Sequence, residues 1–131
     1  MKIRKACTDD VRDIGSVHVA VWKSAHTGLI PPTVLDEQNE YARTAFWKQF
    51  LIENVWPVYV AEIDHEIVGF ASCVACRDQD KDSDQVFELA AIYLLNKIGR
   101  QGVGSALLSQ CSQFGVSRGF DTMALWVLEK N

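Results

Sequence analysis

The sequence of 131 residues lacks an apolar run long enough for a membrane span, and Met1–Lys5 leads into the polar Thr8–Asp10 rather than into a signal-peptide core. It also lacks a basic excess: the net charge is -4, which argues against a nucleic-acid binder, since such proteins normally present a basic face. We therefore expect one cytoplasmic domain, residues 1–131, without a membrane or nucleic-acid partner. The acidity suits a cationic or amine substrate, but solubility alone is the favoured explanation.

Zinc-site spacing is also missing, although the chain has four cysteines. Cys73 and Cys76 form a CxxC within an apolar, strand-like run, where residues three apart point to opposite faces. No second CxxC and no paired histidines complete a metal site. We expect no metal, and small buried thiols in a reducing compartment are the favoured interpretation.

The apolar pattern predicts a mixture of strands and helices. Thr8 is the expected N-cap of the first helix, Gly119 ends the last one, and Tyr41, Ala45 and Phe50 are apolar positions of the second. Strands are expected at residues 2–6, 58–63, 67–76, 87–95 and 122–128. The first helix is expected from residue 8 to the break at 28–32, the second from about residue 33 or later to 52, and the third at residues 103–116.

The most distinctive segment is NKIGRQGVGSALLSQC, residues 96–111, where a glycine-rich turn separates a strand from a helix. Backbone N–H groups at a helix start favour a phosphate, and glycines let the phosphate come close. A Walker loop would need Lys before Ser or Thr, but Gly104-Ser105-Ala106 lacks the Lys. Glycines 99, 102 and 104 give GxxGxG rather than the GxGxxG of a dinucleotide fold. A close-packed loop without a ligand remains the alternative.

The flanks of this loop carry a family resemblance. ELAAIYLLNKIGRQGVGSALL, residues 88–108, resembles the cofactor-binding segment of the GCN5-related N-acetyltransferases (GNAT family), in which a strand of the kind E-L-x-x-I-Y-V leads into Q/R-x-x-G-x-G/A and a helix. A second segment, VHVAVWKSAHTGLIPPTVLD at residues 17–36, is similar to the paired first helices of many small members of the family. The pair Gly69-Phe70 is similar to a signature of their strands. The resemblance covers essentially the whole chain.

The resemblance implies an α/β (α+β) fold with a mixed, mostly antiparallel sheet flanked by helices. The implied order is strand, helix, helix, three strands, helix, strand. It also implies that the loop binds acetyl-CoA through its pyrophosphate, that backbone groups near Leu94 and Leu95 pair with the pantetheine arm, and that an amide near Leu94 stabilises the oxyanion. The implied cofactor-binding residues are Leu94, Leu95, Arg100, Gln101, Gly102, Val103, Gly104, Ser105 and Asn131.

Two departures from the family pattern stand out. The first loop position, Gln or Arg in the family, is Gly99 here, which backbone binding of phosphate tolerates. The family usually continues beyond N-x-x-A with a helix, two strands and a Tyr that protonates the leaving thiolate, whereas this sequence stops at Asn131, the Asn of that motif. The apolar last strand would then have an unpaired edge, so we expect a homodimer.

Candidate catalytic residues follow from the same resemblance. Glu88 matches the position of a general base, with a structural strand carboxylate as the alternative. Tyr93 is a candidate acid, although an aromatic residue at this position more often belongs to the core. His26 and Trp22 are expected near the acceptor amine. His18 is either a core histidine or a proton carrier. Trp47 and Trp56 either wall the acceptor pocket or belong to the core.

Two functions of different classes therefore stand. The first is an acetyl-CoA-dependent N-acetyltransferase in which a primary amine attacks the thioester directly. The second is a catalytically degenerate acyl-CoA-binding or dimerising protein on the same scaffold. A nucleotide-binding module is weaker because no Lys precedes Ser or Thr in the loop. The sequence does not choose between a small-molecule and a peptide amine.

Overall fold

A computed structural model describes residues 1–29, 31, 33, 39–53, 56–76, 85–98 and 102–125, and its centre is a five-stranded sheet in the order β1-β2-β3-β4-β5. The strands are β1 (Lys2–Lys5), β2 (Val58–Ile63), β3 (Glu66–Ala75), β4 (Val86–Leu94) and β5 (Thr122–Leu125). The pairs from β1 to β4 are antiparallel, and β5 runs parallel to β4. The predicted mixed, mostly antiparallel sheet is confirmed.

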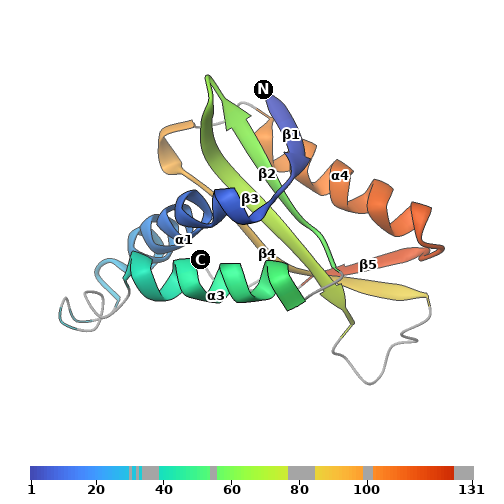
Figure 1. Ribbon diagram of the computed structural model, residues 1–131, viewed down its shortest axis with the longest axis horizontal. Coiled ribbons are helices and arrows are strands. Elements are labelled where there is room, and N and C mark those ends of the chain that lie inside the picture. Colours follow the sequence, from blue (N-terminus) through green and yellow to red (C-terminus); the bar gives the residue numbers. More distant parts are fainter. Residues whose placement is uncertain are drawn as a thin grey trace.

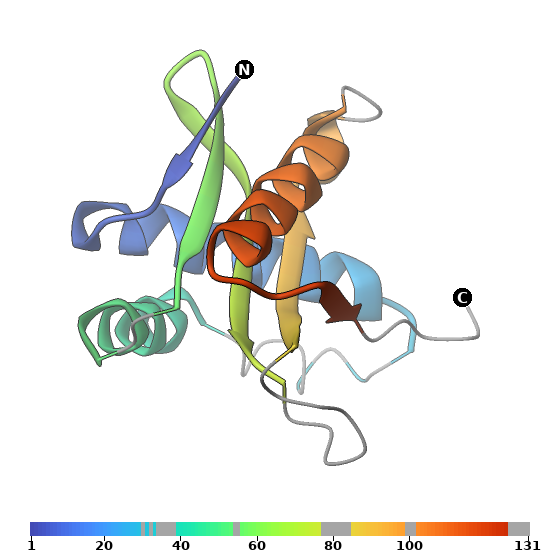
Figure 2. The ribbon, with the colours of Figure 1, turned by 90° about the vertical axis from the view of Figure 1, so that its right-hand side faces the viewer.

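Helices cover both faces of this sheet (Figures 1 and 2). Helices α1 (Val11–His26) and α3 (Glu40–Glu53) pack side by side on one face, and α4 (Val103–Ser117) lies on the other. Gly15 of α1 permits close contact with α3, because a Cβ there would lie 2.9 Å from the backbone nitrogen of Thr44. In the part of the chain that the structure describes, no helix is long and apolar enough to cross a membrane.

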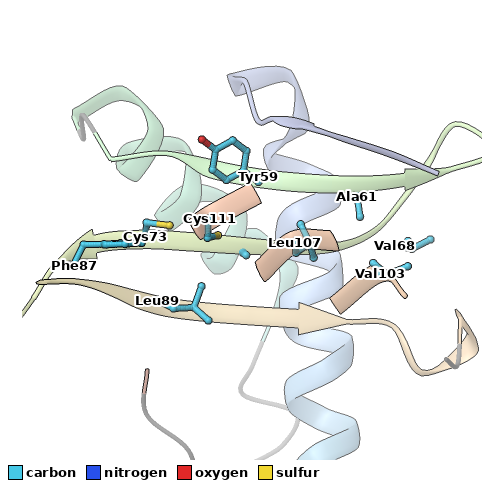
Figure 3. Packing of buried hydrophobic residues seen from close by; sticks show 10 residues of the cluster. Tyr59, Ala61, Val68, Cys73, Phe87, Leu89, Val103, Leu107 and Cys111 are labelled. Carbon is cyan, nitrogen blue, oxygen red and sulfur yellow. The ribbon is translucent and has the colours of Figure 1, made fainter. Parts of the chain in front are cut away.

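Each face of the sheet has its own apolar core. Under α4, Leu107 and Cys111 pack onto Tyr59, Cys73 and Leu89 of the central strands (Figure 3). The hydrogen bond with Cys111 and burial raise the pKa of the Cys73 thiol, so the thiol is protonated at neutral pH. Cys73 is therefore a packing residue, as predicted, whereas Cys76 is only partly buried and Cys7 is exposed. The core under α1 and α3 contains Ile14, Val17, Trp47, Val58, Val60 and Phe70.

Two predictions about the helices are wrong. Thr8 is not the N-cap of α1: residues Thr8–Asp10 form a 3-10 turn, and the Asp10 carboxylate accepts the Cys7 N–H at 2.8 Å while pairing with Arg4. In α3, Tyr41 is 87% exposed and Ala45 is exposed as well. The inner side of the helix contains the buried Trp47 with the partly buried Phe50 and Leu51, because these residues meet the core formed with α1 and the sheet.

A β-bulge in β4 changes the side-chain alternation of that strand. Ser72 of β3 pairs with Ala91 and Cys73 pairs with Leu89, so Ala90 is the extra residue. Before the bulge Leu89 faces α4, and after it Ile92 and Leu94 do. Strict alternation would place Glu88 and Tyr93 on opposite faces. The bulge instead brings both to the face covered by α1 and α3.

Close packing between α4 and β4 makes Gly115 sensitive to substitution. A Cβ there would overlap the ring of the buried Phe87. We expect Gly115→Ala to lower the free energy of unfolding by about 2 kcal/mol, although alanine is the better helix former by about 1 kcal/mol. Urea denaturation measures the change in the free energy of unfolding. Val116→Ala is the control, because Val116 is exposed on the same helix. Unchanged or higher stability of Gly115→Ala would contradict the described packing.

Candidate functional site

The second half of β4 presents an unpaired backbone edge in the described structure. The described pairing between β4 and β5 extends from Val86 to Leu89, while β3 follows β4 to Leu94. The Leu95 N–H donates to the Val68 carbonyl at 2.9 Å and is therefore used within the sheet. Because backbone groups alternate in direction along an antiparallel strand, the N–H and C=O of Leu94 point to the open edge. Of the two predicted backbone positions, Leu94 is the one available to a ligand.

The start of α4 lies beside the end of this strand. Gly102 is the N-cap residue of α4, with a φ of +78° and open space around its Cα. A left-handed residue without a side chain cannot cap the helix itself, so the N–H groups of the first turn face outward. A Cβ on Gly104 would lie 3.2 Å from the Leu94 side chain, so the first turn of α4 packs closely against β4.

A cavity of about 370 Å³ lies on the opposite face of β4, under α1 and α3. Its floor contains Ala90 and Ala91 at the bulge, together with Ser72 and Val74 of β3. Aromatic side chains form most of the wall: Trp22, Phe46, Trp47, Phe50 and Tyr93. The cavity thus lies beside the second half of β4, the same segment that presents the open backbone edge.

His18 is the buried histidine of the cavity wall. Its Nδ1 accepts the Trp47 indole N–H at 3.0 Å, and the Tyr93 ring stacks on it with centroids 4.6 Å apart. Burial, assisted by the positive charge of Arg43, lowers the pKa of His18 to about 4. The imidazole is therefore neutral at pH 7, and it is a weak acceptor for a proton from an ammonium group.

Glu88 lies at the same face of the sheet and has no exposed surface. It pairs across the strands with Val74, which lines the cavity, and side chains of directly opposite residues share a face. The Ser72 side chain is on that face as well, and it is 1% exposed. Glu88 is fully buried and is not among the described lining residues of the cavity. A proton from a ligand in the cavity would therefore reach Glu88 through an intervening group rather than by direct contact with the carboxyl.

The remaining candidates fall into three places. Trp22 lines the cavity, and His26 stacks on Trp22 with its Nδ1 2.7 Å from the Trp22 carbonyl oxygen. Trp56 packs against Phe87 and other aromatic rings under α4, so it does not belong to the cavity wall. Three predicted cofactor-binding residues lie outside the described residues: Arg100, Gln101 and Asn131.

Of the residues that line the cavity, sequence reasoning named His18, Trp22, Trp47 and Tyr93 and missed the others, among them Arg43, Phe46 and Ser72. A signal was present for Arg43 and Phe46, because residues 43, 46, 47 and 50 follow the helical spacing i, i+3, i+4, i+7. No comparable signal marks Ser72, whose place in the cavity depends on which face of β3 the two helices cover.

The neutral His18 predicts a specific pH dependence of stability. Its pKa is about 4 in the folded protein and 6.5 in an unfolded chain. The unfolded state therefore takes up the proton first, and stability is lost as the pH falls from about 6.5 towards 4. We expect a loss of about 2 kcal/mol between pH 7 and 4.5 from this residue alone.

Urea denaturation at both pH values measures the His18 contribution. His18→Gln retains an acceptor for the Trp47 indole and should remove most of the pH-dependent loss. His65→Asn is the control, because His65 lies in the exposed β2–β3 turn with a φ of +67° that Asn tolerates. Equal pH dependence of stability in the unsubstituted protein and in His18→Gln would contradict the lowered pKa of His18.

Comparisons with known proteins show the family of this chain and the solved structures that share its fold. The model of the acetyltransferase (GNAT) family matches residues 22–131. The chain is 35% identical over 130 residues to the uncharacterized N-acetyltransferase YuaI of Bacillus subtilis, covering 98% of this chain and 72% of that protein. Its fold is similar to that of PaiA N-acetyltransferase from Thermoplasma acidophilum in complex with coenzyme A, with a TM-score of 0.77, 18% identity, and coverage of 99% of this chain and 80% of the other. It is also similar to AAC(6')-Iy in complex with a bisubstrate analogue of CoA and acetylneamine, with a TM-score of 0.74, 20% identity, and coverage of 99% and 81%. The chain belongs to the GNAT acetyltransferase family.

Proposed function

We propose that the protein transfers the acetyl group of acetyl-CoA to a primary amine by direct attack of the amine on the thioester. One observation carries the proposal: the open edge of β4 lies between the start of α4 on one side and an aromatic cavity on the other. A thioester held along that edge would be reached by an amine from the cavity. Both substrates could then be present together.

The start of α4 fits a pyrophosphate. The first-turn amides of Val103, Gly104 and Ser105 supply N–H donors, and the positive end of the helix dipole favours a dianion. A side chain at Gly102 would extend into the open space that the phosphates need. Contacts from Arg100 and Gln101 remain predictions. Gly102 and Gly104 are therefore the positions at which cofactor binding can be tested.

The Leu94 backbone fits the acyl arm. Its N–H and C=O point to the open edge, where they can pair with the amides of pantetheine as a neighbouring strand would. An N–H on this edge is also a donor for the carbonyl oxygen, whose negative charge increases during attack. This role requires no charged side chain.

The reaction requires a neutral amine and an exit for its proton. The amine nitrogen forms a bond to the acetyl carbon, the carbon–sulfur bond breaks, the thiolate leaves, and the nitrogen loses one proton. We assign that proton to Glu88 as general base, acting through an intervening water or the Ser72 hydroxyl, because the carboxyl has no exposed surface. Tyr93 is the phenol of the cavity wall and is the candidate proton donor to the thiolate.

A second function, CoA binding without turnover, is favoured by the burial of Glu88. A carboxyl with no exposed surface is also what a structural residue in the sheet would show. In that case the loop would bind the cofactor while Glu88→Gln would leave any slow acetylation unchanged.

Calorimetric titration of acetyl-CoA tests the proposal. We expect binding in the micromolar range, nearly equal binding of dephospho-CoA, which retains the pyrophosphate and pantetheine, and much weaker binding of ATP, which lacks pantetheine. Thiol release on addition of an amine then tests turnover. A folded protein that binds neither CoA form would exclude the enzyme function.

Three expectations from the sequence stay predictions: one domain over residues 1–131, a cytoplasmic location and a homodimer. The dimer is supported by the position of β5 at one edge of the described sheet, because exposed strand edges tend to pair with another chain.

A further inference from the structure

His18 presents a hydrogen-bond donor of known identity at the wall of the cavity beside β4. The indole N–H of Trp47 is a donor only, and it lies 3.0 Å from the Nδ1 of His18. Nδ1 is therefore the unprotonated nitrogen of the ring. Because burial and the charge of Arg43 lower the pKa of His18 to about 4, the ring is neutral at pH 7 and its hydrogen is on Nε2.

Neighbouring rings hold the imidazole in one orientation. Tyr93 stacks on it with an angle of 24° between the planes, and the fully buried Phe70 lies 6.2 Å from it between ring centroids. A 180° flip of the imidazole would leave the indole N–H of Trp47, a residue that is 3% exposed, without its acceptor. The Nε2–H of His18 therefore keeps one direction.

This N–H is open to the cavity. His18 lines the cavity and is 7% exposed. In the described part of the chain, no residue accepts a hydrogen bond from Nε2, and no buried side-chain nitrogen or oxygen lacks a partner. Nε2 is therefore not sealed in the core, and the cavity is the open space that lies beside its ring. A ligand atom that accepts a hydrogen bond can reach the nitrogen there.

The hydroxyl groups of the described lining do not specify the chemistry of a ligand. The hydroxyls of Ser72 and Tyr93 rotate, and each donates or accepts according to its partner. The neutral imidazole differs from them, because its accessible nitrogen only donates. It therefore selects a ligand atom with a lone pair, such as a carbonyl, hydroxyl or ether oxygen, and makes no hydrogen bond with a methylene or an ammonium group.

From this arrangement, and resting on the proposed acetyl transfer, we propose that the acceptor is a primary amine that also carries an oxygen atom, and that this oxygen accepts the hydrogen bond of the His18 Nε2–H. Trp47 is a positioning residue, because its indole keeps the hydrogen on Nε2. Amino amides, amino ethers and amino alcohols share the required chemistry. A simple alkylamine of the same size lacks it.

Nitrogen NMR of protein labelled at histidine tests the donor without relying on turnover. At pH 7.5 the His18 signals should show an unprotonated Nδ1 and a protonated Nε2, and their loss in His18→Gln assigns them. His26 is the internal contrast, since its Nδ1 lies 2.7 Å from the Trp22 carbonyl oxygen and therefore carries a hydrogen. A His18 ring that is protonated mainly on Nδ1, or that is a mixture of both forms, would overturn the inference.

Two pairs of amines with matching non-hydrogen skeletons test the ligand oxygen: 3-methoxypropylamine with pentylamine, and glycinamide with isobutylamine. They are titrated into the free protein and into protein saturated with CoA, and the two pairs distinguish an ether from a carbonyl oxygen. For the oxygen-containing member of at least one pair, we expect the Nε2–H proton signal of His18 to move downfield and to exchange more slowly with solvent. The hydrocarbon partner should cause neither change.

Two variants at position 18 locate the effect. His18→Leu has no donor, so the affinity of the oxygen-containing amine relative to its hydrocarbon partner should fall about fivefold, the usual size of one hydrogen bond. His18→Gln has an acceptor for the Trp47 indole and an N–H group for the cavity, so it should retain most of the preference. Because two ligands are compared within one protein, a general loss of affinity cancels. Circular dichroism and urea denaturation confirm that each variant is folded.

The outcomes separate this inference from the proposed function. An unchanged preference in a folded His18→Leu protein overturns the inference, because another donor would then bind the oxygen. Failure of the His18 Nε2–H to respond to either oxygen-containing amine also overturns it, even where CoA binds and thiol is released. A response of this N–H in a protein that does not bind CoA supports the donor site and removes acetyl transfer.

Discussion

Gly102→Asp is expected to weaken acetyl-CoA binding by about two orders of magnitude. The residue is the left-handed N-cap of α4, and open space surrounds its Cα. A carboxylate there would stand within about 5 Å of a bound phosphate, and two like charges at that distance repel by about 3 kcal/mol at an effective dielectric constant of 20. Calorimetric titration measures the loss, and about 1.4 kcal/mol corresponds to each factor of ten.

Gly119→Asp is the matched control for this loss. Gly119 follows the other end of the same helix with a φ of +86° and open space around it, so the substitution introduces the same side chain into the same backbone conformation. Both variants should lose about 1 kcal/mol of stability from the left-handed conformation, but Gly119→Asp should leave CoA affinity within about threefold. Equal affinities of the two variants would contradict a phosphate site at the start of α4.

Gly104 provides a steric counterpart without added charge. A Cβ at this position already lies 3.2 Å from Leu94, and the two γ-methyl groups of valine would occupy the space between the helix start and the β4 edge. Gly104→Val is therefore expected to weaken both acetyl-CoA and dephospho-CoA. If it weakened neither, the cofactor would not pass between the loop and Leu94.

Glu88→Gln is expected to lower kcat by about a hundredfold, the lower end of the usual contribution of a general base. Glutamine has the same shape, and the position is fully buried, so the variant tests proton transfer rather than packing. CoA affinity should change little, because Glu88 faces the cavity side of the sheet and not the loop. Steady-state assays across pH measure kcat, and the pH profile should change along with it.

Asp10→Asn is the control for burial of a carboxylate. Asp10 is 6% exposed and forms an ion pair with Arg4, which lowers the pKa of Asp10 to about 2. It lies outside the described lining of the cavity, so the variant should lose stability and retain its kcat. If Glu88→Gln behaved in the same way, with an unchanged pH profile, Glu88 would be structural and the function without turnover would be favoured.

Local patterns in the sequence predicted most elements of the fold. Residues 58–63 and the start of α4 at residue 103 agree with the structure, because alternating β-branched residues and a glycine before a helical stripe are short-range signals. The family resemblance is also contained in a contiguous segment, residues 88–108. The sequence was less informative about α3, where several stripes were possible and Tyr41 was assigned to the wrong one.

The functional site depends on contacts that no short segment contains. The bulge at Ala90 places Glu88 and Tyr93 on one face, and it is defined only by the register between β4 and β3. Likewise, Trp56 lies under α4 while Trp22 and Trp47 line the cavity, although all three are equally apolar in sequence. The sequence by itself determined the strands, helices and glycine loop, since local hydrogen bonds and periodic burial encode these. Only the tertiary structure decided which side chains share the cavity with Arg43, because helix packing and strand register are set by residues far apart in the chain.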